Sequence, residues 1–137
     1  MFRFHKPLDI ITLFHKASSP ASVRAAAVLK QASAKATEAA AEDQPNDKPA
    51  YRSDFELNIT EELPTADQVQ TILNYIGKNK VSSIIRGATS ETDALKKFKE
   101  NIDSFQRPVI VDWHKGKAIA TDSESEILKM LAPSGGK

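Results

Sequence analysis

Cysteine is absent from the 137 residues of the chain, which removes disulfides, thiolate nucleophiles and thiolate metal ligands together. The three histidines, His5, His15 and His114, have no metal-ligand spacing, so we expect no metal and no cofactor. No apolar run approaches the roughly 20 residues that cross a bilayer, so we expect a soluble chain with no membrane partner. An excess of one charge is lacking too: 19 basic and 18 acidic residues leave a net charge of +1, which does not suggest a nucleic-acid partner and does not exclude one.

A length of 137 residues with 40% hydrophobic content suits one domain with a single core. We therefore predict a single domain over residues 1–137. Two prolines and mixed charge predict a mobile loop over 42–52, and the glycine-rich end predicts a flexible tail over 133–137.

The first 16 residues carry three basic residues against one acid, Asp9. This is a weak form of the composition typical of organelle-targeting segments. The same basic residues also suit the solvated start of a strand, so composition alone does not establish a transit peptide.

The stretch from Asp9 to Leu29 predicts a buried strand, a serine-rich turn and a long helix. Residues 10–14 are apolar, β-branched or aromatic, which favours a strand. Pro20 suits the first turn of a helix over residues 20–41, with Ser18 or Ser19 as its N-cap. The turn therefore lies at a helix N-terminus, where backbone N–H groups stabilise a thiolate or bind an oxyanion.

The remaining chain alternates between strand and helix signals. Alternating apolar residues predict a strand over 55–59, and Thr65 with Gln68 forms a capping box for a helix that ends at Gly77. Ser90 caps a further helix with apolar residues recurring as far as Phe105. The other predicted elements are one or two helical turns over 81–86, strands over 109–113 and 118–120, and a last helix with a capping box of Ser123 and Glu126.

This order, strand, helix, strand, helices, two strands and a helix, predicts an α/β fold. It is the thioredoxin-like order: three layers, with a four-stranded mixed sheet flanked by helices. Order alone leaves other α/β arrangements open.

Several short motifs resemble arsenate-reductase-like thioredoxin folds. His15, Ser19 and Ser22 resemble the His-x3-Cys-x2-Ser turn of that family, with Ser19 at the cysteine position. Together with Ser18 they form a degenerate active-site turn. Arg86 and Arg107 are similar to the arginines that hold an oxyanion there. By the same resemblance, Pro108 is expected to be cis, although only about 5–6% of X–Pro bonds are cis in general.

Over nearly its full length the chain resembles a fungal mitochondrial family of redox proteins with a thioredoxin-like fold, formerly a domain of unknown function. The residues that carry this resemblance are the opening 1–30, the run 64–68 and the strand end 111–113. The resemblance implies a mitochondrial location and an oxidoreductase that reduces small toxic molecules.

Thiol exchange needs sulfur, because the thiolate is both nucleophile and leaving group. Serine at position 19 does not replace it, and no acid in the turn orients His15 as a general base, so we expect no catalytic residue there and favour helix capping. Enzyme activity is left undecided. Two hypotheses follow: a mitochondrial redox protein without intrinsic thiol catalysis, or a binding or assembly module of a larger mitochondrial complex.

The expected partners are a small oxyanion or a protein. Backbone donors of the turn together with Arg86 and Arg107 suit phosphate, arsenate or a carboxylate. The simpler alternative is that each arginine forms a surface ion pair. Asp112, if buried, requires a hydrogen-bonding partner, and Trp113 is expected to be a core or rim aromatic.

Overall fold

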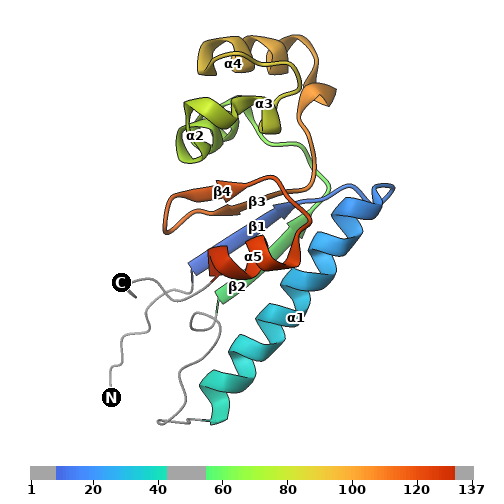
Figure 1. Ribbon diagram of the computed structural model, residues 1–137, viewed down its shortest axis with the longest axis vertical. Coiled ribbons are helices and arrows are strands. Elements are labelled where there is room, and N and C mark those ends of the chain that lie inside the picture. Colours follow the sequence, from blue (N-terminus) through green and yellow to red (C-terminus); the bar gives the residue numbers. More distant parts are fainter. Residues whose placement is uncertain (1–8, 43–54, 132–137) are drawn as a thin grey trace.

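In the computed structural model, which describes residues 9–42 and 55–131, three helices separate the second strand from the third, and a last helix follows the fourth strand (Figure 1). The strands are β1 (Asp9–Phe14), β2 (Phe55–Thr60), β3 (Val109–Asp112) and β4 (Lys117–Ile119). The helices are α1 (Pro20–Glu42), α2 (Ala66–Ile76), α3 (Val81–Ile84), α4 (Glu91–Glu100) and α5 (Glu124–Leu131), with 3-10 turns at Lys78–Lys80 and Ile102–Ser104.

The four strands form one mixed sheet in the order β2-β1-β3-β4. β1 pairs with β2 in parallel, and β3 pairs antiparallel with both β1 and β4. The register places Thr12 of β1 beside Asn58 of β2 on one side and Val111 of β3 on the other. The predicted α/β fold with a four-stranded mixed sheet is therefore confirmed.

Helices cover the two faces of this sheet with separate cores. Ile11 and Leu13 of β1 pack with residues of α1 and α5, including Leu29 and Ile127. Phe14 of β1 and its neighbours on β3 pack instead with α2, α3 and α4. β3 is buried on both faces, with three apolar residues followed by the buried Asp112. Burial of one such large apolar side chain is worth about 1.5–3 kcal/mol.

The β3–β4 hairpin needs a glycine at its turn. Gly116 has φ of +69°, a conformation that other residues rarely adopt. A Cβ at this position would make an ordinary van der Waals contact with the ring of Tyr75, 3.5 Å away, so the backbone conformation and not a lack of space favours glycine. The hairpin predicted from this glycine-containing connection is present.

The helix predicted to run from Ser90 to Phe105 is shorter than expected. α4 ends at Glu100, because Asn101 has an extended backbone and its side chain accepts a hydrogen bond from the Asp103 N–H, 3.1 Å away. Asn101 thereby starts a separate 3-10 turn. Phe105 is buried beyond that turn, and bridges to Ile85.

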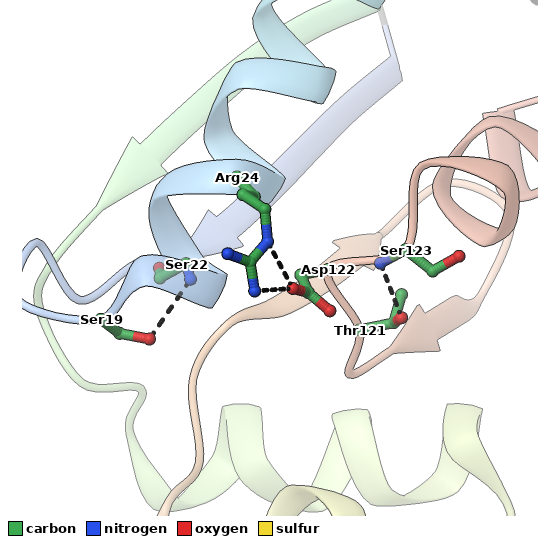
Figure 2. Close-up of polar contacts among 6 residues, drawn as sticks. All are labelled: Ser19, Ser22, Arg24, Thr121, Asp122 and Ser123. Atoms are coloured by element: carbon green, nitrogen blue, oxygen red, sulfur yellow. Dashed lines mark hydrogen bonds and ion pairs between the residues drawn. The ribbon is translucent and has the colours of Figure 1, made fainter.

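The two predicted capping boxes have different outcomes. Thr65 and Gln68 form the full reciprocal box at the start of α2. At α5 only half of it forms: Ser123 Oγ accepts from the Glu126 N–H at 3.5 Å, but the Ser123 N–H donates to Thr121 Oγ1 at 3.0 Å (Figure 2). Thr121, which follows the last strand, takes the place predicted for Glu126.

Most of the predicted loop at 42–52, the predicted tail at 133–137 and the basic part of the N-terminus at 1–8 lie outside the described residues. Glu42 is the exception, because it is the last residue of α1 rather than the first of the loop.

Candidate functional site at the start of helix α1

Ser19 is the N-cap of α1. Its Oγ accepts a hydrogen bond from the Ser22 N–H at 3.3 Å, and its carbonyl oxygen accepts from the Val23 N–H at 3.0 Å (Figure 2). The Ser19 N–H donates to the Lys16 carbonyl, which closes the turn that follows β1. Ser18 is exposed. Of the two predicted cap residues, Ser19 therefore fills the role.

The His15 side chain contacts Ser22 rather than Ser19. Its Nδ1 lies 2.6 Å from Ser22 Oγ, and the same oxygen accepts from the Lys16 N–H at 2.8 Å. Ser22 is completely buried, so its hydroxyl is out of reach of a substrate. The pair holds the turn together and does not form a nucleophile with its base.

Arg107 joins the loops that follow β1 and β2. Its Nη1 donates to the carbonyl oxygens of His15 at 3.4 Å and of Glu61 at 3.2 Å. Its Nε is buried and has no hydrogen-bond partner within the described chain. The resemblance implies a cis bond before Pro108, and the Arg107–Pro108 peptide bond is cis. The structure therefore brings Arg107 to the turn.

Arg86 lies elsewhere. Its side chain is exposed in the connection between α3 and α4, and its backbone N–H donates to the Ser104 carbonyl at 3.0 Å. Across the described residues, no hydrogen bond joins the Arg86 guanidinium to the turn. The two arginines that the sequence groups together are thus held by different parts of the fold.

Several backbone donors of the turn have partners within the chain. Besides Ser19, Lys16 and Ser22, the Ala17 N–H donates to the Glu61 carboxylate at 3.2 Å. Glu61 therefore supplies an anion to the turn from the neighbouring loop. An external oxyanion would compete with this carboxylate and with the serine hydroxyls.

An ion pair ties the start of α1 to the segment before α5. Arg24 Nε lies 2.8 Å from Asp122 Oδ2, and Nη2 contacts the same oxygen (Figure 2). The Arg24 side chain is 63% exposed, so water screens the pair and its contribution to stability is small.

Asp112 and Trp113 have structural partners. Asp112 is fully buried, and its Oδ1 accepts from the N–H groups of His114 and Lys115 at 3.1 and 3.0 Å. This agrees with the expectation that a buried carboxylate is partnered. Trp113 Nε1 donates to Thr12 Oγ1 at 2.8 Å, and its ring meets Tyr75 edge to face.

Glu61 and Thr12 make contacts in this region but were not predicted from the sequence. Thr12 had a signal, because it is the polar residue of an otherwise apolar strand. No local sequence pattern marks Glu61, since its partner Ala17 lies 44 positions away. Within residues 9–42 and 55–131, no group of three or more His, Asp or Glu residues is placed to hold a metal ion. In the same residues, no helix has the length and apolar character to cross a membrane.

Comparisons with known proteins give a family and one informative relative. The chain is 44% identical over 63 residues to the protein of Schizosaccharomyces pombe named "Putative redox protein fmp46, mitochondrial". This match covers 46% of the chain and 52% of the relative, so the chain spans about half the length of the curated relative it matches. The relative's name supports the mitochondrial location expected for this chain. No solved structure matches the chain significantly.

A family defined by sequence also matches nearly the whole chain. Residues 2–122 match the family described as "Protein of unknown function (DUF1687)". This range includes β1, the α1 turn, α2 and the β3–β4 hairpin. The chain therefore belongs to the DUF1687 family.

Proposed function

We propose that the chain is a mitochondrial protein of thioredoxin-like fold, from a redox family, that carries the active-site turn without its thiol. The observation on which this rests is the position of Ser19, at the cap of the helix that follows the first central strand. The sheet order β2-β1-β3-β4, with one parallel and two antiparallel pairs, is compatible with a thioredoxin-like fold. The relative's name is consistent with a redox role.

The proposal excludes thiol catalysis by the chain itself. A cysteine at a helix N-terminus has its pKa lowered from about 8.5 toward 7 or below, which makes it a nucleophile at neutral pH. A serine hydroxyl is activated only by an adjacent base. His15, the nearest histidine in the turn, contacts buried Ser22 instead. A role in thiol–disulfide exchange would therefore need a thiol from a partner.

A disulfide-reduction assay with the purified full chain tests the absence of intrinsic catalysis. The chain is incubated with a thiol donor and a disulfide, a peroxide or arsenate, and the rate is compared with that of the donor alone. We expect equal rates. Acceleration that scales with protein concentration would contradict the proposal, provided that heat-unfolded protein gives none.

A binding or assembly module is a second candidate. It is favoured by the hydrogen bonds of Arg107 and Glu61, which hold the turn as a fixed surface rather than a reactive one. Affinity capture from mitochondrial extract is expected to recover a stable protein partner. Repeated recovery of the chain alone would count against this candidate.

A further inference from the structure

The side of the sheet that faces α2 is open over β1 and β2. A groove of about 530 Å³ lies there, with Ile10, Thr12, Asn58 and Thr60 along its strands and Glu62 and Trp113 among its other lining residues. Ile10, although on a central strand, is 42% exposed. Figure 1 shows α2, α3 and α4 on the β4 side of the sheet, with β2 farthest from them.

β2 is also the edge of the sheet in the described part of the chain, because β1 is its strand neighbour there. The Thr60 carbonyl accepts from the His15 N–H at 2.8 Å and so points inward. In a strand, the N–H and C=O of one residue point to the same side and alternate residues point oppositely. The main-chain groups of Leu57 and Ile59 therefore point away from β1, to the outer edge.

The segment that contains β2 and the loop after it carries charge of one sign, although Arg107 from another segment contacts the Glu61 carbonyl. Residues 55–70 include Glu56, Glu61, Glu62 and Asp67 and no lysine, arginine or histidine, although the whole chain has a net charge of +1. Glu56 is exposed and alternates onto the same face as Asn58 and Thr60. Glu62, also exposed, lines the groove just beyond the end of the strand.

The outer edge of β2 and the acidic residues beside it indicate which kind of partner would bind. Unpaired main-chain groups at an edge are a template for another extended chain. A second copy of β2 would bring the same acidic residues into contact, so self-pairing is opposed by repulsion. A segment with basic side chains at alternate positions would direct them about 6.7 Å apart along one face, toward Glu56 and Glu62.

We propose that the outer edge of β2 and the adjoining groove bind an extended, basic peptide segment by adding it as a fifth strand. Main-chain hydrogen bonds to Leu57 and Ile59 provide the pairing, and Glu56 and Glu62 attract its basic side chains. The site does not depend on the chemistry of the α1 turn, so the outcome of the reduction assay leaves it unaffected.

The test uses the full chain and an acetylated, amidated hexapeptide in which arginine alternates with valine. Isothermal titration calorimetry measures binding, and the fluorescence of Trp113, the chain's one tryptophan, which lines the groove, reports whether the peptide also enters the groove. In low-salt buffer we expect saturable binding that weakens as salt screens the charges. Amide hydrogen exchange should slow at Leu57 and Ile59 when the peptide is bound.

Control peptides separate charge from strand pairing. The hexapeptide with glutamate for arginine should not bind. The arginine peptide with N-methyl groups on its four central residues keeps its charge and loses its main-chain donors, so it should bind at least about tenfold more weakly. Equal binding of either control, or of arginine amide alone, would overturn the proposal.

Variants of the chain locate the site. Replacing both acids, with Glu56→Gln and Glu62→Gln, should weaken binding by roughly fivefold to tenfold, the effect of losing two exposed charge pairs. Glu100→Gln, at the far end of α4, removes a comparable exposed acid and should change nothing. Equal effects of the two sets of variants, or exchange that slows at the α1 turn and not at β2, would contradict this location.

Discussion

The α1 turn follows β1, and the outer edge of the sheet lies on the neighbouring strand β2. The two regions differ in whether their backbone polar groups are hydrogen-bonded within the chain. In the turn, the N–H groups of Lys16, Ala17 and Ser22 all donate to oxygens of the chain itself. On β2, the main-chain groups of Leu57 and Ile59 point away from β1, to the outer edge of the sheet that the described residues form. The turn is the region that family resemblance marks as functional, yet the edge is the more open of the two.

In this contrast the turn is a region held in place by its own hydrogen bonds. Ser19 retains the capping role of a residue at a helix N-terminus, and Ser22 and Arg107 fix the loops around it. The interactions there contribute mainly to stability. Substitutions in the turn should therefore change stability, whereas substitutions on the β2 edge should change binding.

The largest effect on stability is expected from Ser22→Ala. The change leaves the Lys16 N–H and the His15 side chain without their common partner in a buried site, which costs about 1–3 kcal/mol of the free energy of unfolding. Urea denaturation followed by circular dichroism measures the loss. Ser82→Ala, at an exposed position of α3, and Glu56→Gln on the β2 edge should each stay within about 0.5 kcal/mol. A Ser22→Ala loss no larger than that would contradict the structural role of the turn.

Ser19→Ala should have a smaller effect. Loss of an N-cap serine costs about 1 kcal/mol, because the Ser22 N–H loses its acceptor at the start of α1. Ser90→Ala, which removes the N-cap of α4, is the matched comparison and should cost a similar amount. The same urea series gives both values. If Ser19→Ala left stability unchanged while Ser90→Ala lowered it, Ser19 would not be the cap.

An oxyanion at the turn should give only a small thermal shift. Because the N–H groups of Lys16, Ala17 and Ser22 already have partners, we expect weak binding, with a rise in Tm of about 2 °C or less at about 10 mM phosphate or arsenate. Differential scanning fluorimetry measures the shift. Arg107→Ala should abolish it and Arg86→Ala should not, since Arg86 lies away from the turn. A rise that persists in Arg107→Ala would place the anion elsewhere.

The smallest expected effect is a shift in a pKa at the start of α4, which lies outside both regions and serves as a reference. The Thr89 backbone N–H, 2.9 Å from Asp93 Oδ2, is the main cause that holds the pKa of Asp93 below its ordinary value of 3.8, with Lys97 adding to the shift. Since the folded pKa is depressed, the stabilisation is present above pH 3.8 and is lost as the pH falls through the folded pKa. An NMR titration of the Asp93 carboxyl carbon should give a midpoint below 3.8. A midpoint at or above that value would contradict the contact.

Much of the fold was predictable because its signals are local. The apolar run of β1, the Pro20 start of α1 and the Thr65–Gln68 box each act within a few residues, and the structure contains all three. The end of α4 was not predicted, because apolar spacing continues to Phe105 while Asn101 stops the helix through its own side chain.

Most residues of the turn were predicted from the sequence, but their hydrogen-bond partners were not. His15, Ser19, Ser22 and Arg107 do meet at the turn, whereas Arg86 lies elsewhere. The partner of His15 is Ser22, seven positions on, because the first turn of α1 carries Ser22 inward. The contacts of Arg107 and Glu61 span 44 to 92 positions of sequence, and they depend on a tertiary arrangement that no local pattern contains.

The most direct test of the account is the thiol pKa of the Ser19→Cys variant, measured from the pH dependence of its alkylation rate. Because the chain has no other cysteine, the signal belongs to that position alone, and Gln31→Cys, at an exposed position in the middle of α1, serves as the reference. The account predicts a pKa of about 7.5 or lower for Ser19→Cys against about 8.5 for the reference. Equal values for the two variants would contradict the claim that the turn is a thioredoxin-like active site without its sulfur.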